Sequence, residues 1–323
     1  MAGKEMTAAR LRPRRKKWKA GQIVAFFVAS IPLLGFLIFN GLPLIISFIG
    51  MFCNVDLNDL NNIEWNNFDG FKALFVPQYA LPLTGFNLEK HFWKAVTITV
   101  WVASAQLVTL AIAMFIATLL HERPMGAKLF QILFFVPYIC STVAVALMWR
   151  WIFDTDGGIL NSLLGKNIDW LYDPDYMTWC IIVAIIWQAP GYGIVMYKAA
   201  FSNVNHSLYE AAALDGANAW QKFRYVTMPG ISPTTFFLMQ AGVVAGVLTY
   251  DLAILIIPAG FGFAGKDEMG LTLIRLVYYL ITNRQTQNPG LMVSAACIIS
   301  WLLFIVTGVL SMILFRMREK SME

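Results

Sequence analysis

The stretch YEAAALDGANAWQKFRYVTMP, from Tyr209 to Pro229, lies between two apolar runs that are each long enough to cross a membrane. It is rich in residues that favour helices, and Gly216 interrupts the helical pattern. The sequence therefore predicts a polar loop, at about 203–229, that folds as a short helix, a turn and a second short helix. The second helix is expected over about 218–226.

The ends of these two helices carry recognisable capping residues. Ser207 can cap the first helix, with Glu210 three residues further on at the spacing of a capping box. Asp215 can cap the second helix or bond to a partner, and Pro229 is expected to end the second helix. Glu210 is also suited to a charge-assisted bond with an Arg or Lys of a partner, and the alanines beside it allow close approach. The alternative is a short amphipathic helix that lies on the membrane.

The composition places the chain in a membrane. Hydrophobic residues make up 58% of the chain and charged residues only 13%, whereas soluble domains have about 45–50% and about 25%. The four cysteines are scattered, and no Cys/His spacing indicates a metal or redox site. We therefore expect an all-α membrane protein with no bound metal.

Six apolar runs are long enough to span a bilayer, which needs about 20 residues. A seventh, over about 271–281, is too short to span and is expected to lie at the interface or to re-enter between helices. We predict a basic segment at 1–21 followed by one transmembrane domain at 22–323. The six predicted spans are 22–51, 93–120, 129–153, 177–199, 231–257 and 291–315.

Basic residues set the predicted orientation. The segment before the first span, the loops after the second and fourth spans and the C-terminal tail all carry Lys and Arg. Because positive residues mark the cytoplasmic side, both termini are expected inside the cell. The basic N-terminal segment can be a lipid-binding or partner-binding tail, or only a determinant of topology.

The polar loop also resembles a known motif. Glu210-Ala211-Ala212, then Gly216, then the ending at Pro229 are similar to the EAA loop of ABC importer permeases, in the form found in the carbohydrate-uptake family that includes the maltose-system membrane subunits.

The resemblance extends from about the second span to the C-terminus. Three further stretches carry it, together with the pair Tyr250-Asp251. They are WRWIFDTDGGILNSLL at Trp149–Leu164, WLYDP at Trp170–Pro174 and IIWQAPGYGIVMYKAAF at Ile185–Phe201. Two departures stand out. Val204-Asn205 replaces a frequent Ile-Pro, and IIPAGFGFAG replaces a Thr-x-Gly-Gly-Pro stretch after the fifth span.

This resemblance implies the architecture of a type I ABC importer permease in the cytoplasmic membrane of a bacterium or archaeon. Such a permease has no ATPase of its own, and the sequence contains no GxxxxGK[ST] phosphate loop. The implied partners are a second, similar permease, two cytoplasmic ATPase subunits that bind ATP and Mg, and an extracytoplasmic solute-binding protein. The chain itself is expected to bind no cofactor and to be no enzyme.

The resemblance also assigns roles within the loop. The loop would move as a rigid lever when the ATPases close, and Glu210 would pair with a cationic group on the ATPase. Leu214 and Phe223 would hold the loop against the spans. The residues expected to couple to the ATPase are Glu210, Ala211, Ala212, Asp215, Gly216, Phe223 and Pro229.

Polar and aromatic residues inside the spans are candidates for the solute pathway. Asp251 is placed in the outer half of the fifth span, and a Gly/Pro-interrupted fourth span can expose backbone to a cavity. Each candidate also has a packing explanation: a helix-packing hydrogen bond for Asp251, core packing for the aromatic residues and interhelical bonding for the glutamines. The candidates are Asp251, Tyr250, Trp187, Gln188, Tyr192 and Gln240, with Gln106 as a further one.

Two other functions stay open. The first is an ABC importer permease for another solute, such as glycerol phosphate or a polyamine, although few basic residues lie in the predicted spans. The second is an ATP-independent secondary transporter, which would need ion-coupling carboxylates and preferably inverted repeats. Asp251 alone is weak support for it.

Overall fold

The computed structural model describes residues 20–55, 63–76, 87–122, 126–257, 270–282 and 288–322. The chain forms two units, Met1–Ile49 and Gly50–Glu323. The basic residues of the predicted N-terminal segment up to Lys19 lie outside the described residues, as does the departing stretch after Ile257.

The first unit contains one membrane-length helical run. It consists of α1 (Ala20–Phe36), a π-helical turn η1 (Leu37–Gly41) and α2 (Leu42–Gly50). In η1 the N–H of Leu42 bonds to the carbonyl of Leu37, one residue beyond the usual partner. This wider turn directly precedes Pro43, which has no N–H to donate, so the helix continues through the proline.

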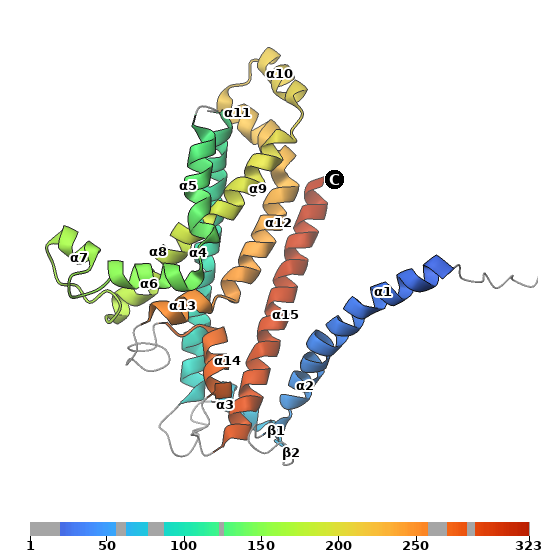
Figure 1. The fold of residues 1–323 in the computed structure, drawn as a ribbon, viewed down its shortest axis with the longest axis vertical. Helices are drawn as coiled ribbons and strands as arrows, with labels where there is room; N and C mark the ends of the chain where they lie inside the picture. The colour runs from blue at the N-terminus through green and yellow to red at the C-terminus, as the bar shows by residue number, and fades with distance from the viewer. Residues whose placement is uncertain are drawn as a thin grey trace, which may run out of the picture. The chain divides into compact units, whose positions relative to one another are not determined.

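Four further membrane-length helices belong to the second unit. Together with Phe26–Gly50, the described residues hold five helices that are long and apolar enough to cross a membrane. The four are α4 (Leu88–Glu122), α8 (Pro174–Gln188) with α9 (Pro190–Ser202), α11 (Ala219–Lys222) continuing through η2 (Phe223–Thr227) into α12 (Met228–Val247), and α15 (Pro289–Met322). α4 lies at the centre between α9 and α12, and α15 packs on the far side of α12 (Figure 1).

The predicted third span, 129–153, is broken. It forms α5 (Ala127–Ile139) and α6 (Thr142–Ile152), which meet at an angle of 96°, so that a sixth span exists only if this bent pair is counted as one. Pro137 removes one hydrogen bond from the last turn of α5. Cys140 and Ser141 then adopt extended backbone conformations, which aim α6 in a new direction.

The fifth span was predicted to continue to residue 257, which is too far. α12 stops at Val247, and a separate helix α13 (Asp251–Ile256) follows. Where the backbone leaves the helix, the carbonyl of Thr249 accepts a hydrogen bond from the hydroxyl of Thr272 at 3.2 Å. Asp251 is therefore the exposed first residue of a short helix and does not lie inside a span.

The predicted short apolar helix is confirmed as α14 (Leu273–Thr282), which packs on α15. The connection after α2 holds an element that the sequence did not suggest, an antiparallel pair of β1 (Cys53–Val55) and β2 (Ile63–Trp65). The short helix α3 (Asp69–Phe75) follows β2 and packs on α15. The fold is thus helical except for this one hairpin among the described residues.

Glycines allow the helices to approach closely. A Cβ at Gly191 of α9 would lie 2.5 Å from the carbonyl oxygen of Phe134 on α5, and one at Gly193 would lie 2.8 Å from the Cβ of Ala113 on α4. A Cβ at Gly246 of α12 would lie 2.8 Å from the Cα of Ala103 on α4. Small residues at such crossings are typical of membrane helix packing, where close van der Waals contact replaces the hydrophobic effect.

We predict that Gly191→Val strongly lowers the stability of the folded protein. The contact at Gly191 is with backbone, which cannot move aside as a side chain can, so overpacking here should cost at least about 1–3 kcal/mol. The measurement is the fraction of monodisperse protein after heating in detergent. Gly308→Val on α15 is the matched control, since a Cβ there meets nothing within 4 Å; equal losses for both variants would contradict the proposed crossing.

Candidate functional site

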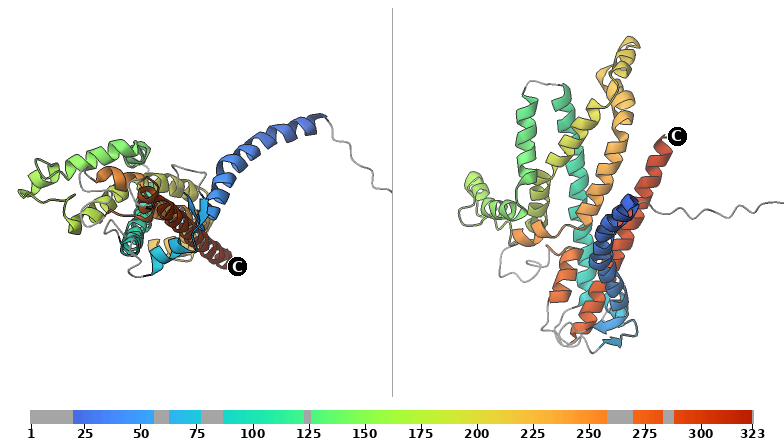
Figure 2. Two further views of the ribbon diagram at one scale, coloured as in Figure 1. Left: turned by 90° about the horizontal axis from the view of Figure 1, so that it is seen from below. Right: turned by 45° about the vertical axis from the view of Figure 1, so that its right-hand side comes forward.

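The polar loop forms a compact pair of short helices beyond the ends of α4 and α5 (Figures 1 and 2). Its first helix is α10 (His206–Leu214). The N-cap is Asn205, whose side chain accepts a hydrogen bond from the N–H of Ser207 at 3.1 Å. The prediction of Ser207 as the cap was wrong by two residues, because an asparagine side chain reaches the free N–H groups equally well.

The first helix ends in a Schellman motif built on Gly216. The N–H of Ala217 bonds to the carbonyl of Ala212 at 2.9 Å, and the N–H of Gly216 bonds to that of Ala213 at 3.1 Å. Gly216 has φ +76°, in the left-handed region that favours glycine. Asp215 is the C-cap of α10, so it does not cap the second helix.

The second helix, α11, begins with a capping box. Asn218 accepts from the N–H of Gln221 at 2.9 Å, and the side chain of Gln221 accepts from the N–H of Asn218 at 2.8 Å. α11 does not end at Pro229, as the sequence predicted, but runs through η2 into α12. The N–H of Met228 bonds to the carbonyl of Phe223 in a wider π turn. Pro229 directly follows this turn, so the helix continues through the proline although it has no N–H to donate. The loop is thus joined rigidly to a span.

A hydrogen bond braces α10 against this π turn. The hydroxyl groups of Tyr209 and Thr227 lie 2.9 Å apart, and Thr227 is buried. Phe223 is half-buried and stacks on Trp220 with ring centroids 5.7 Å apart. Leu214, in contrast, is 91% exposed, so the prediction that it holds the loop against the spans was wrong for this chain alone.

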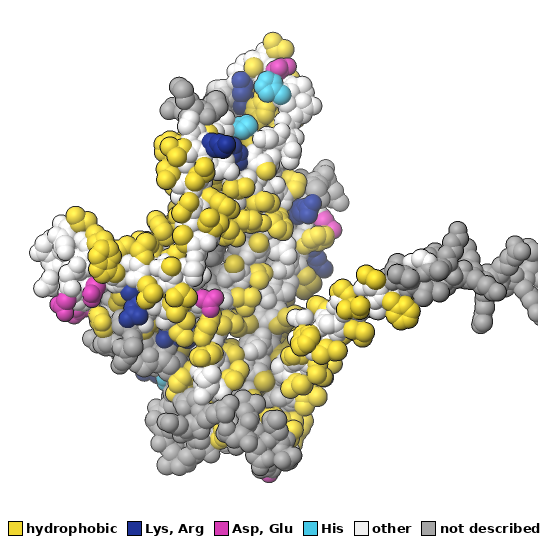
Figure 3. All heavy atoms as spheres, in the orientation of Figure 1, with side chains coloured by type: hydrophobic (Ala, Val, Ile, Leu, Met, Phe, Trp, Pro, Cys, Tyr) yellow, Lys and Arg dark blue, Asp and Glu magenta, His cyan; other side chains and the backbone are white. Residues whose placement is uncertain are grey.

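The loop exposes large apolar side chains together with the carboxylates of Glu210 and Asp215. Glu210 is exposed and bonds only to the ring of His206, at 3.1 Å, among the hydrogen bonds of the described residues. Ala211 is exposed and Ala212 half-buried. Figure 3 shows His and basic side chains gathered over this end of the unit. The large apolar side chains exposed on the loop are Leu208, Leu214, Trp220 and Tyr225.

Some of the predicted pathway residues meet at a hollow of about 310 Å³ between α4, α5, α9 and α12. Gln106 and Tyr192 both line it. Tyr192 stacks on Tyr138 of α5, with ring centroids 5.6 Å apart. A polar amide and two aromatic rings thus face one space among the spans.

The other predicted pathway residues lie elsewhere. Trp187 packs edge-on against Trp149 at 5.9 Å, and Gln188 ends α8. Gln240 is exposed on α12 and is not among the residues that line the hollow. Tyr250 lies in the break before α13, with its ring 5.4 Å from that of Tyr278 on α14.

A buried arginine beside Tyr250, Arg275, is not among the residues that the sequence singled out. Arg275 of α14 is 4% exposed and donates to the carbonyl of Ala253 at 3.3 Å. Its Nε has no hydrogen-bond partner, and it lies close enough to Tyr250 to interact electrostatically.

Asn161 was also missed. It lies in α7 (Ile159–Leu164), and its side chain donates to the carbonyls of Asp154, Thr155 and Ile168 and accepts from the indole of Trp170 at 2.7 Å. One buried amide thereby organises the whole connection after α6. In the sequence, Asn161 is marked only by its place in the stretch Trp149–Leu164, which carries the family resemblance.

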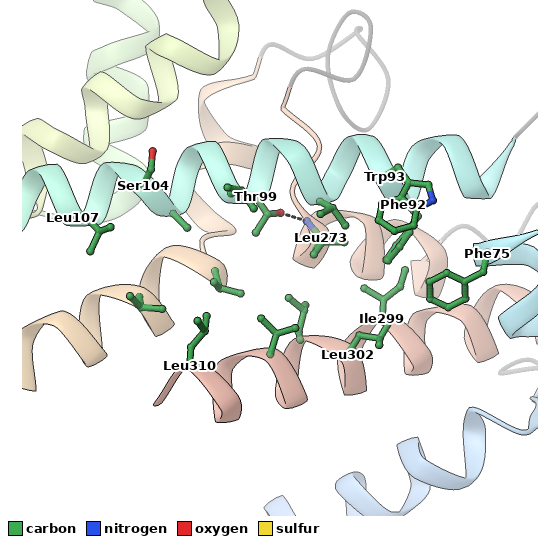
Figure 4. Close-up of a pocket in the computed structure, with 17 residues that line it drawn as sticks. Phe75, Phe92, Trp93, Thr99, Ser104, Leu107, Leu273, Ile299, Leu302 and Leu310 are labelled. Atoms are coloured by element: carbon green, nitrogen blue, oxygen red, sulfur yellow. Dashed lines mark hydrogen bonds between the residues drawn. The ribbon is translucent and has the colours of Figure 1, made fainter. Parts of the chain in front are cut away.

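A larger groove lies between α4 and α15 (Figure 4). It encloses about 530 Å³ and is lined almost entirely by apolar side chains. Its two hydroxyl groups are occupied, since Thr99 accepts from the N–H of Leu273 and Ser104 donates to the carbonyl of Trp101. The groove therefore offers a polar solute few hydrogen-bonding groups.

The protein family follows from a comparison with known sequences. Residues 109–319 match the family described as binding-protein-dependent transport system inner membrane component. The chain belongs to this family. The matched region runs from the middle of α4 to the last turn of α15, and so includes the loop of α10 and α11.

Two relatives of this transport-component family are similar over most of the chain. The probable ABC transporter permease protein YesP of Bacillus subtilis (strain 168) is 30% identical over 291 residues, covering 88% of this chain and 86% of the relative. The lactose transport system permease protein LacF of Rhizobium radiobacter is 29% identical over 231 residues, covering 69% and 75%. The chain is therefore a multi-pass transport component of the cytoplasmic membrane and not an ATPase subunit.

The fold matches a solved transporter of the same kind. A chain of the bacterial ABC transporter that imports the acidic polysaccharide alginate superposes with a TM-score of 0.75 at 21% identity, over 93% of this chain and 96% of that chain. This likeness concerns the fold alone.

Proposed function

We propose that this permease carries a carbohydrate and is driven through the loop of α10 and α11 by partner ATPase subunits that bind ATP and Mg. The observation that carries the proposal is the build of that loop. Its two short helices are capped by Asn205, Gly216 and Asn218, and the second is continuous with the span α12. A push on the exposed apolar face would therefore move a span and not merely a flexible loop.

The remaining partners follow from the same scheme. A second, similar permease completes the pore, and an extracytoplasmic binding protein delivers the solute. Both termini and the loop of α10 and α11 face the cytoplasm, which the positions of the basic residues support. Among the loop residues, Glu210 meets a cation of the ATPase, while Ala211, Ala212 and Gly216 allow close contact.

The carbohydrate assignment is supported by the aromatic and amide lining of the hollow at Tyr192 and Gln106, since aromatic faces and amide groups suit sugar rings and hydroxyls. A relative is a lactose permease. The test is ATP hydrolysis by the reconstituted transporter with its binding protein, loaded in turn with each solute of a panel. Stimulation by an oligosaccharide is expected; stimulation only by a polyamine would overturn the assignment.

A second candidate, an acidic solute, is favoured by Arg275. A buried guanidinium with an unpartnered Nε next to Tyr250 could meet a carboxylate or phosphate of the solute. The solved relative imports an acidic polysaccharide. Including a uronic acid oligomer and glycerol phosphate in the panel separates the two candidates.

We predict that Tyr209→Phe uncouples transport from ATP hydrolysis. The change removes the hydrogen bond to Thr227 but keeps the ring, so the brace between α10 and the π turn weakens by about 1 kcal/mol. The number of solute molecules carried per ATP should fall severalfold, while the ATPase remains bound. Thr227→Ser keeps the hydroxyl and is the control; an unchanged ratio in Tyr209→Phe would show that the brace transmits no force.

A further inference from the structure

A second polar hollow lies under the loop of α10 and α11. It encloses about 510 Å³ and is bounded by the last turns of α4 and α9, the first turn of α10, and α11 with η2. It lies on the side of the loop that faces the ends of α4 and α9, and His206, one of its lining residues, also bonds to Glu210 on the exposed face of the loop.

Three side chains that can carry positive charge line this hollow. They are His121 of α4, His206 of α10 and Lys222 of α11. No carboxylate is among the lining residues, and no described side chain forms a salt bridge with Lys222. His206 is already paired with Glu210, so the hollow presents the ammonium of Lys222 from α11 and the imidazole of His121 from α4 without a neutralising carboxylate.

Its walls are not uniformly polar. Phe201 and Phe223 contribute aromatic surface, and the ring of His121 lies 5.4 Å from that of Phe201. The aromatic part of the lining offers a small soluble anion no hydrogen bonds, so such an anion would use only the polar part. A molecule with an anionic headgroup next to an apolar portion would contact both the polar and the aromatic parts of the lining.

The depth of the hollow fits a lipid headgroup. α4 has 35 residues, which at 1.5 Å per residue makes it about 52 Å long, whereas the hydrocarbon core of a bilayer is about 30 Å thick. The helix therefore extends beyond the hydrocarbon core, and its end, which supplies Thr118 and His121, is suited to the headgroup region. Basic pockets between helices at this level are suited to anionic headgroups.

We propose that this hollow binds the phosphate of an anionic phospholipid, with Lys222 and His121 as its ligands and the phenylalanines against the glycerol. Lys222 precedes the π turn that joins the loop to α12. The bound lipid thus fastens the loop to the membrane surface at its hinge. The inference requires only that the spans cross a bilayer, and it does not depend on the solute or on the ATPase scheme.

The test is native mass spectrometry of the purified transporter, titrated separately with phosphatidylglycerol, phosphatidylcholine and inorganic phosphate. We expect retention of phosphatidylglycerol above phosphatidylcholine, and retention about fivefold weaker in Lys222→Gln, the ratio expected for one basic residue at an anionic membrane surface. Arg224→Gln is the control, because Arg224 is exposed two residues away and does not line the hollow.

A second variant covers the case in which Lys222→Gln fails to assemble. His121→Gln removes a ligand from α4 without touching the loop, and should also weaken retention of phosphatidylglycerol. Equal retention of both lipids, or an equal loss in Arg224→Gln, would overturn the site. Displacement of phosphatidylglycerol by inorganic phosphate at similar concentration would show a soluble-anion site instead.

Discussion

Uptake is expected to disappear when Glu210 is replaced by lysine, although the protein still inserts into the membrane. The side chain of Glu210 is 68% exposed on α10, and its bond to His206 is within the same helix. Reversing its charge therefore leaves the fold of the chain intact. At the interface with the ATPase, however, an attraction becomes a repulsion.

The expected loss of ATPase binding can be judged from other charged pairs at protein interfaces. Removing one partner of such a pair costs about 2–5 kcal/mol when the pair is desolvated by association. This corresponds to about 30-fold weaker binding or more. Uptake into vesicles and recovery of the ATPase with the purified permease are the two measurements. Both should be lost in Glu210→Lys, intermediate in Glu210→Gln and largely kept in Glu210→Asp.

The series also separates coupling from assembly. An acidic substitution in the ATPase that restores uptake to Glu210→Lys would locate the cation that Glu210 meets. Full uptake by Glu210→Lys would instead mean that the carboxylate makes no contact across the interface, and the loop would then be better described as an amphipathic helix on the membrane.

The membrane spans were predictable because a long apolar run is by itself a sufficient signal. Long apolar runs must be helices that satisfy their own backbone hydrogen bonds in lipid. Accordingly, α4 and α15 contain the predicted runs 93–120 and 291–315 in full. The predicted spans 129–153 and 231–257 were wrong because the backbone changes direction within a run that stays apolar.

Those changes of direction depend on contacts from distant parts of the chain. The end of α12 is stabilised by the hydroxyl of Thr272, which is 23 residues away from Thr249. The bend after α5 lies beside Gly191 of α9, whose lack of a side chain admits the backbone of Phe134. A sequence pattern within one run carries no record of either contact, so one long span was predicted in each case.

The loop illustrates the opposite limit. Its helix–turn–helix plan and Gly216 were predicted from local preferences, and both are present. The caps were misassigned, because Asn205 and Asn218 compete with Ser207 and Asp215 for the same role. Arg275 could not be assigned at all, since its burial depends on how α14 packs against other helices.

Gly216→Pro is the second substitution expected to abolish uptake, and it acts through the backbone alone. Gly216 has φ +76°, and its N–H donates to the carbonyl of Ala213. An ordinary residue pays about 1–2 kcal/mol for the left-handed conformation. Proline has no N–H, and its ring holds φ at about −65°, so it cannot adopt the conformation at all.

The loss would spread from the turn to both short helices. Without the Schellman motif, the last turn of α10 unwinds, and Asp215 and Leu214 no longer hold their positions relative to α11. The exposed face then ceases to be a rigid surface, although no side chain on it has changed. ATPase recovery and uptake should therefore both fall as far as in Glu210→Lys, while membrane insertion persists.

Two controls show that the conformation of Gly216 is responsible. Gly216→Asn should keep most of the uptake, because asparagine tolerates the left-handed region better than other residues with side chains. Gly157→Pro places the same strain, at φ +92°, in the connection after α6, and should leave ATPase recovery unchanged. Equal recovery of the ATPase with Gly216→Pro and with Gly216→Asn would contradict this role of the turn. The coupling would then depend on the continuity of α11 with α12 alone.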